Sequence, residues 1–240
     1  MKWLFTLALL FATNANAYNW PTITAKSWLV ADGDGKVIDS QNAQAQRSIA
    51  SISKLMTVLI VLDRHQNLDE IISQQPRIDW INLALIKSDN HAAKVLCDNY
   101  PGGTNACIYA MNIKARVLNM PETHFIEPTG LSVMNVSTAT DLVQLVLAVS
   151  KYPEIVEASS SSEVKIKLRN KWFVFHNTNS IIGKRHKFIV SKTGYINASG
   201  GCIVMMLDTD VGRRIVVVLG SKNTRTRIPE AEFFAKKYKD

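Results

Sequence analysis

The chain has 240 residues, of which 47% are hydrophobic and 20% are charged, and its formal net charge is +8. This length and composition predict one globular domain with a sizeable core, without repeats or low-complexity linkers. The basic residues are spread along the chain and are not interleaved with aromatic residues, which argues against a nucleic-acid-binding protein.

The N-terminal residues have the pattern of an export signal. Lys2 precedes an apolar run from Trp3 to Ala12, and Ala15-Asn16-Ala17 supplies the small residues of a cleavage site. This pattern predicts a cleaved secretory signal over residues 1–17 and a mature domain over residues 18–240. A permanent membrane anchor is the alternative, but this run is shorter than the roughly 18 apolar residues that span a bilayer. In an exported protein, the positive charge favours attraction to an anionic cell-envelope polymer.

The first elements after the signal are a strand hairpin and a long apolar helix. Residues 27–31 and 36–38 flank a turn with two glycines, which predicts the hairpin. The helix is expected from Ser51 to Leu62 and is apolar almost all round, as in a buried central helix. Ser51 and Lys54 then lie on one face of its first turn, at the positive end of the helix dipole. Roughly one such Ser-x-x-Lys pattern is expected by chance in a chain this long.

Helical patterns occupy the middle of the chain. They cover residues 79–87, 90–97 and 104–118, and an ordered loop is expected at 125–131. Thr138 with Asp141 three residues later predicts a capped helix that continues to residue 149.

The chain has three cysteines, and the sequence does not decide whether two of them form a disulfide. Cys97 and Cys107 flank the turn at Pro101-Gly102-Gly103, so a disulfide across a helical hairpin and two buried free thiols are both possible. Cys202 is expected in a core strand.

The last third of the chain changes to the period of strands. Apolar and basic residues alternate from Val164, which predicts a half-exposed strand. The basic side chains of Lys165, Lys167, Arg169 and Lys171 are expected to form its solvated face, and a substrate-facing role for them is the alternative. Further strands are expected at 187–191, 202–207 and 214–219, and a closing helix at 229–238. Strands at both ends and helices between them predict an α+β fold, with one sheet built from N- and C-terminal strands.

Two further motifs change the meaning of Ser51 and Lys54. Ser88-Asp89-Asn90 lies between two predicted helices, and Lys192-Thr193-Gly194 ends a predicted strand. The three motifs in this order are typical of penicillin-binding proteins and class A β-lactamases. The chain therefore resembles the low-molecular-mass penicillin-binding proteins, which are serine D-alanyl-D-alanine carboxypeptidases and endopeptidases. It is most similar to the endopeptidase branch in four more stretches, at residues 49–57, 125–131, 135–139 and 177–179.

The resemblance implies a β-lactamase/transpeptidase-like fold and an acyl-enzyme mechanism. Ser51 is the implied nucleophile, and Lys54 is its base if burial and a neighbouring cation, Lys192, lower its pKa. Ser88 is the implied relay of the proton to the leaving amine. The backbone N–H groups of Ser51 and Tyr195 are the implied oxyanion hole.

The resemblance also implies how a substrate binds. Asn90 would hydrogen-bond the substrate backbone, and Lys192 would attract its carboxylate. Thr193 would add a hydroxyl beside the substrate, and Gly194 would leave room for it to lie along the strand. Of the two arginines in Arg225-Thr226-Arg227, Arg227 is the better match for the family's carboxylate-binding arginine. The implied partners are peptidoglycan peptides, with β-lactams as covalent inhibitors.

No cofactor or metal is expected in this scheme. The five histidines have neither H-x-H nor H-E-x-x-H spacing, which argues against a zinc peptidase. The expected location is the periplasm.

The chain departs from the family in two places. The segment between Ser51 and Ser88 is short, and the missing part lies between Leu68 and Asn82, where relatives carry loop structure near the site. The chain also stops soon after Arg227, so we expect no additional C-terminal domain and no stable membrane anchor after signal cleavage. A minimal enzyme with an altered cleft rim is the resulting expectation.

Two other functions stay open. A β-lactamase needs a further general base, but no E-x-x-x-N arrangement lies between Ser88 and Lys192, and Glu127 precedes a proline within the family's own loop. A non-catalytic sensor of β-lactams or wall peptides would keep an intact acylating site, so the motifs alone do not separate it from an enzyme.

Overall fold

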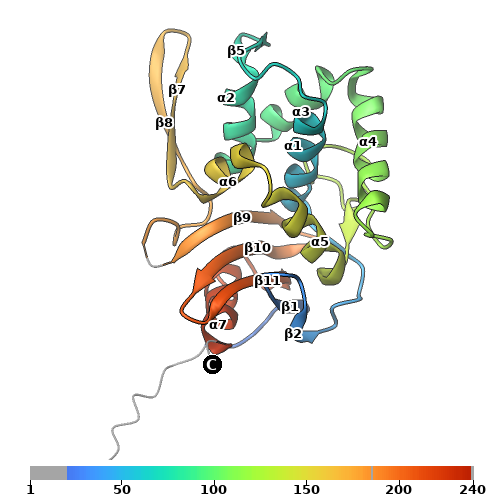
Figure 1. The fold of residues 1–240 in the computed structure, drawn as a ribbon, viewed down its shortest axis with the longest axis vertical. Coiled ribbons are helices and arrows are strands. Elements are labelled where there is room, and N and C mark those ends of the chain that lie inside the picture. Colours follow the sequence, from blue (N-terminus) through green and yellow to red (C-terminus); the bar gives the residue numbers. More distant parts are fainter. Residues whose placement is uncertain (1–20, 185, 239–240) are drawn as a thin grey trace, which may run out of the picture.

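A five-stranded antiparallel sheet and a helical region on one of its faces make up the fold (Figure 1). The computed structural model describes residues 21–184 and 186–238, so the predicted signal over residues 1–17 lies outside it. In spatial order the sheet is β2 (Val37–Gln41), β1 (Ser27–Asp32), β11 (Gly212–Ser221), β10 (Gly200–Thr209) and β9 (Lys187–Ile196). The predicted pairing of N- and C-terminal strands is confirmed, since β1 pairs with β11.

Both faces of the sheet are covered. Successive side chains of a strand point to opposite faces, so Leu29 joins the core under the helices while Trp28 and Val30 join the core on the other side. The closing helix α7 (Arg227–Lys237) covers that other side, where Phe234 stacks on Trp28 at 4.3 Å between ring centroids. Burial on both faces explains why the central strands are almost continuously apolar.

The helical region is built around α1 (Ser53–Asp63), in which every residue from Ser53 to Leu62 is buried. A short 3-10 turn, η1 (Ala50–Ile52), precedes it and contains Ser51. The other helices are α2 (Arg77–Asn82), α3 (Asn90–Asp98), α4 (Gly103–Val117), α5 (Ala139–Val149) and α6 (Pro153–Ser160). No helix in the described ranges is long and apolar enough to cross a membrane.

Several predicted boundaries are wrong in detail. The single helix expected over 79–87 is α2 followed by a π-helical turn, η2 (Leu83–Lys87). The strand expected to end at residue 191 continues as β9 to Ile196, because its pairing with β10 runs through Lys192-Thr193-Gly194. Helix α6 was not predicted, although a proline at its first position favours a helix start.

A second hairpin stands apart from the main sheet. Strands β7 (Glu163–Leu168) and β8 (Lys171–His176) pair only with each other and project beyond the helices (Figure 1). The sequence indicated β7 but not β8, whose residues are mostly exposed on both faces and do not alternate. Arg169 and Asn170 form the tight turn with φ values of 47° and 64°.

Four shorter strands lie among the helices, paired as β3 (Arg47–Ser48) with β6 (Val136–Ser137) and β4 (Ile71–Ile72) with β5 (Gln75–Pro76).

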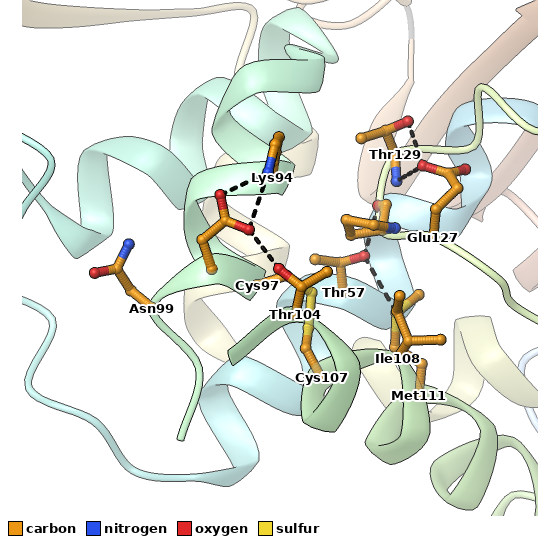
Figure 2. Close-up of a disulfide and its surroundings, with 12 residues drawn as sticks. Thr57, Lys94, Cys97, Asn99, Thr104, Cys107, Ile108, Met111, Glu127 and Thr129 are labelled. Carbon is orange, nitrogen blue, oxygen red and sulfur yellow. Dashed lines mark hydrogen bonds and ion pairs between the residues drawn. A yellow bond between two sulfur atoms is a disulfide. The ribbon is translucent and has the colours of Figure 1, made fainter. Parts of the chain in front are cut away.

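A disulfide joins α3 to α4 in the helical region (Figure 2). It connects Cys97 and Cys107, both fully buried, and so answers the question that the sequence left open. Cys202 is a free, buried thiol on β10, as predicted. The bridge ties two helices that flank α1 and are separated by a turn.

Candidate active site

The candidate nucleophile lies at the point where the chain enters the central helix. Ser51 occupies η1, and Lys54 is in the first turn of α1, so the expected three-residue spacing brings them together on one face. The Lys54 Nζ atom lies 2.9 Å from Ser51 Oγ. Ser51 is half-buried and Lys54 is fully buried, so the serine side chain is the accessible member of the pair.

Lys54 has two further polar contacts in its buried environment. Its Nζ donates hydrogen bonds to Asn90 Oδ1 at 2.7 Å and to the Thr129 carbonyl at 2.5 Å. Burial lowers the pKa of Lys54 to about 8, while the Glu127 and Asp89 carboxylates act in the opposite direction. The neutral amine that can accept a proton is therefore accessible near neutral pH.

The Ser88-Asp89-Asn90 motif lies in the connection between η2 and α3. Ser88 ends η2 with φ 61°, in the left-handed region. Asp89 caps α3 by accepting a hydrogen bond from Ala92 N–H at 3.0 Å, so its carboxylate has a structural role in this motif. Asn90 is the first residue of α3, and its side-chain oxygen is the one that accepts from Lys54.

The second lysine reaches the same centre from the sheet. Lys192 is 1% exposed on β9, and its Nζ donates to Ser88 Oγ at 2.7 Å and to the Thr193 carbonyl at 2.9 Å. Burial lowers the pKa of Lys192 well below its usual value, and the charges of Lys54 and Arg227 lower it further. We expected Lys192 to lower the pKa of Lys54. In the structure burial is the main cause at Lys54, and the repulsion between these two lysines affects Lys192.

Two glycines allow the surrounding backbone to approach the nucleophile. A Cβ atom on Gly194 would lie 2.9 Å from both the Ile49 carbonyl oxygen and the Ser51 nitrogen, so β9 runs directly against η1. A Cβ atom on Gly130, whose φ is 83°, would overlap the Ala50 carbonyl. This close approach sets β9, with Gly194 followed by Tyr195, beside the Ser51 N–H group.

The remaining expected residues line the same strand. The Thr193 hydroxyl lies 2.6 Å from the Thr178 hydroxyl. Arg227, at the start of α7, donates through Nη1 to the Gly194 carbonyl at 2.6 Å, and its buried Nε atom has no hydrogen-bond partner among the described residues. The guanidinium group therefore lies under the C-terminal end of the Lys192-Thr193-Gly194 segment.

The loop after residue 125 contributes residues whose role the sequence did not reveal. The Glu127 carboxylate accepts hydrogen bonds from the N–H groups of Thr129 at 2.7 Å and Gly130 at 2.6 Å. Asn135 donates to the Glu127 carbonyl at 2.8 Å and to the Ser53 hydroxyl at 3.0 Å. These bonds hold the Thr129 carbonyl against Lys54. The Glu-Pro-Thr-Gly stretch was recognised as an ordered loop, but a backbone carbonyl as a lysine partner has no side-chain signature.

This arrangement is suited to acyl transfer. A hydroxyl beside a buried amine with a lowered pKa is an activated nucleophile, and a second hydroxyl beside a second amine offers a route for proton transfer. Lys54 contacts Ser51 and Asn90, Lys192 contacts Ser88, and the loop that carries both Ser88 and Asn90 connects the two groups.

Comparisons with known proteins agree with this geometry. The family model described as D-alanyl-D-alanine carboxypeptidase (Peptidase S11) matches residues 13–76 and 68–223. The two matches overlap at residues 68–76, within the segment that the sequence predicts to be shorter than in relatives. A D-alanyl-D-alanine endopeptidase of Escherichia coli is 40% identical, covering 84% of this chain and 76% of its own. A D-alanyl-D-alanine endopeptidase of Pseudomonas aeruginosa is 38% identical, covering 87% of this chain and 75% of its own.

Solved structures show the same fold. Penicillin-binding protein D2 of Listeria monocytogenes, in its cefotaxime-bound form, has a TM-score of 0.80 and 26% identity, covering 90% of this chain and 97% of its own. A D-alanyl-D-alanine carboxypeptidase of Mycobacterium tuberculosis has a TM-score of 0.81, covering 92% of this chain and 93% of its own, and at 23% identity it shows the fold alone. The predicted α+β fold of the β-lactamase/transpeptidase type is confirmed. The chain is a serine peptidase of the D-alanyl-D-alanine carboxypeptidase family, among the low-molecular-mass penicillin-binding proteins.

Proposed function

We propose that Ser51 attacks the carbonyl carbon of a D-alanine residue in a peptidoglycan peptide and forms an acyl-enzyme that water then hydrolyses. The contact of 2.9 Å between Lys54 Nζ and Ser51 Oγ carries this proposal. Because burial lowers the pKa of Lys54 to about 8, its neutral form can take the serine proton as the new C–O bond forms.

The second hydroxyl–amine pair supplies the proton for the leaving group. Ser88 Oγ lies 2.7 Å from Lys192 Nζ, and Lys54 is linked to the same loop through Asn90. A proton that reaches the Ser88 hydroxyl can pass to the amine released when the C–N bond breaks. Lys192, the Thr193 hydroxyl and Arg227 would bind a substrate carboxylate, whose negative charge favours the protonated form of Lys192.

The open edge of the sheet supplies the binding surface. Strand β9 is at the end of the strand order, so in the part of the chain that the structure describes one side of its backbone has no neighbouring strand within the sheet. An extended peptide can add to that edge, with the Asn90 side chain hydrogen-bonding its backbone. The N–H groups of Ser51 and Tyr195 would then receive the oxyanion.

The relatives favour cleavage of a peptide cross-link over removal of a terminal residue. Both relatives near 40% identity and one at 28% are named endopeptidases, whereas relatives at 24% to 26% are named carboxypeptidases. Digestion of purified muropeptides followed by mass spectrometry tests this choice. Cross-linked dimers converted to monomers support endopeptidase activity, and loss of one terminal D-alanine from monomers indicates a carboxypeptidase. No cleavage of either contradicts the peptidase proposal.

The two alternatives are tested by β-lactam turnover. The Glu127 carboxylate is occupied by its own loop through Thr129 and Gly130, which does not favour its use as the deacylation base of a β-lactamase. Rapid turnover of a chromogenic cephalosporin would favour the β-lactamase. Acylation by penicillin without any peptide cleavage would favour a sensor.

The proposal includes export. Cleavage after Ala17 would release one domain, residues 18–240, into the periplasm, where its net positive charge favours contact with an anionic wall polymer. N-terminal sequencing of the protein from a periplasmic extract tests the cleavage site.

A further inference from the structure

A cavity of about 740 Å³ opens between the projecting hairpin and the helical region. Its walls come from the β4–β5 turn, from α2, from the start of α3 and from the end of the β7–β8 hairpin. The lining residues are Ser73, Gln74, Gln75, Trp80, His91, Leu168, Arg169, Lys171 and Phe173. None of the lysines, serines or threonines of the candidate active site is among them, so this is a separate cavity.

The cavity combines an aromatic floor with a basic rim. Trp80 is held by a hydrogen bond from Nε1 to the Ile72 carbonyl at 2.8 Å, and His91 packs edge-on against it at 5.5 Å between ring centroids. Phe173 faces them from the hairpin and is 44% exposed. Arg169 and Lys171 are exposed cations, and no carboxylate lies among the lining residues. Such a surface is suited to an anionic ligand with amide or apolar groups.

The cavity is directly linked to the catalytic loop. His91 follows Asn90, the residue proposed to bind the substrate backbone. At the base of the hairpin, Lys87 Nζ lies 5.1 Å from the centre of the Phe175 ring, and the Thr178 N–H group donates to the Ile86 carbonyl at 3.1 Å. These contacts fix the hairpin against η2, the turn that ends at Ser88. His91 thus places this cavity next to the residue that is proposed to bind the substrate backbone.

The shortened segment of the chain forms one wall. The turn at Ser73 and Gln74 has positive φ at both residues and connects the two-residue strands β4 and β5. This tight turn lies in the segment that the sequence predicts to be shorter than in relatives, and Ser73, Gln74 and Gln75 form the cavity wall that faces the hairpin.

We propose that this cavity binds the carboxylate-bearing residues of the wall peptide upstream of the scissile D-alanine bond. This inference rests on the proposed peptidase function. Arg169 and Lys171 would bind the carboxylates, and Trp80, His91 and Phe173 would pack against the peptide stem. The enzyme would accordingly select acidic peptides over peptides whose carboxylates are amidated.

Paired substrates and paired variants test the proposal. The substrates are two cross-linked peptide dimers, the kind of substrate that the relatives favour: one carries free carboxylates upstream of the scissile D-alanine bond, and in the other these carboxylates are amidated. The variant Arg169→Asn with Lys171→Gln removes both cations, and Asn tolerates the left-handed backbone at position 169. The control, Lys36→Gln with Lys151→Gln, removes the same charge at exposed positions outside the cavity. Acylation by fluorescent penicillin reports on the catalytic centre alone.

The expected result is a selective loss. In the rim variant, kcat/KM for the acidic peptide falls about tenfold, the value for the amidated peptide changes little, and penicillin acylation is unchanged. The control variant retains the preference for the acidic peptide. Equal kcat/KM for the two peptides in the unaltered protein would overturn the proposal, and so would an unchanged preference in the rim variant. The proposed peptidase function would still stand in either case if the protein reacts with penicillin and cleaves the peptides.

A second variant tests the aromatic part. Phe173→Ala removes an exposed ring without opening the core, and we expect a loss of several-fold in kcat/KM for both peptides. Penicillin acylation should again be unchanged. Unaltered cleavage of both peptides by this variant would contradict the stem contact. Failure of the unaltered protein to react with penicillin and with either peptide would instead refute the proposed function.

Discussion

This molecule contains two pairs of basic side chains, one buried in the core and one exposed to solvent. Lys54 and Lys192 are 0% and 1% exposed, and burial lowers the pKa of both. Arg169 and Lys171 are exposed at the end of a projecting hairpin. Burial makes an amine useful for proton transfer because it favours the neutral form, whereas an exposed cation keeps its charge and acts by attraction.

This difference in burial gives the two pairs different proposed roles: the buried pair takes part in proton transfer, and the exposed pair in substrate selection. The buried pair is held by two hydroxyls, two backbone carbonyls and one side-chain amide that come from separate segments of the chain, so its geometry depends on the packing of those segments. The exposed pair belongs to a hairpin that contacts the body mainly through its base. Residues of the first kind tolerate little change, while residues of the second kind can vary without disturbing the reaction.

Breaking the buried pair should have the largest effect on activity. Lys54→Ala removes the proposed base, and the acylation rate should fall by about 10²- to 10⁴-fold, the usual contribution of a general base. The second-order rate of labelling by fluorescent penicillin measures this loss. Lys171→Ala removes a lysine of the exposed pair and should label at the unaltered rate. Equal loss in the two variants would contradict the division between centre and rim.

The backbone around the buried pair can be tested with glycine substitutions. Gly130→Ala places a methyl group against the Ala50 carbonyl at a positive φ, so the free energy of unfolding should fall by about 3 kcal/mol or more. Gly103→Ala is the matched control, because its φ is also positive, at 74°, but nothing lies within 4 Å of the added atom. It should cost only about 1 kcal/mol. Urea denaturation measures both, and similar losses would show that the close approach at Gly130 is unimportant.

The disulfide should stabilise the fold without affecting the chemistry. It closes a loop with a sequence separation of 10, for which chain entropy predicts about 3 kcal/mol. We expect the double variant Cys97→Ser with Cys107→Ser to lose about this much in urea denaturation while its penicillin acylation rate is retained. Peptide mapping without reductant should recover the linked peptides from the unaltered protein. Their absence would contradict the bridge.

The smallest expected effect is electrostatic. With a pKa of about 8 for Lys54, acylation should increase with pH through this value, because the neutral base forms above it. Asp89→Asn removes a charge that raises this pKa but keeps a good helix cap, so the rising part of the profile should move to lower pH. Asp98→Asn, at the other end of α3, is the matched control. A shift to higher pH in Asp89→Asn would contradict the account.

The same pKa predicts how stability depends on pH. Lys54 binds its proton more weakly in the folded protein, at about 8, than at its usual value of 10.5, so the unfolded chain binds more protons between these values. Its contribution to the free energy of unfolding should therefore increase as the pH rises from about 8 to 10.5. In Lys54→Ala this component should be absent.

Sequence patterns predicted the elements that have a clear period or cap. The first hairpin, the buried central helix, the cap at Thr138 and the three C-terminal strands follow from alternation, helical spacing and capping residues. Strand β8 was not predicted, because its residues are mostly exposed and therefore do not alternate between apolar and polar. The π-helical turn before Ser88 was not predicted either, because one extra residue in a helix leaves the apolar pattern nearly unchanged.

The site was predictable only through its motifs. Each of the three motifs places a serine or a lysine on a helix start, a loop or a strand, and the order of the motifs identified the family. Backbone groups such as the Thr129 carbonyl complete the site, and a backbone partner cannot be predicted from residue types because every residue has one. The cavity at the rim was also beyond sequence reasoning, because its walls come from segments nearly 100 residues apart.

The most direct test of the central claim is the site of acylation by penicillin. After incubation with benzylpenicillin, digestion and mass spectrometry should find the adduct on Ser51 and on no other residue. Ser51→Ala should bind no fluorescent penicillin while it unfolds at the same urea concentration as the unaltered protein. Labelling of Ser51→Ala, or an adduct on another serine such as Ser88, would contradict the mechanism proposed here.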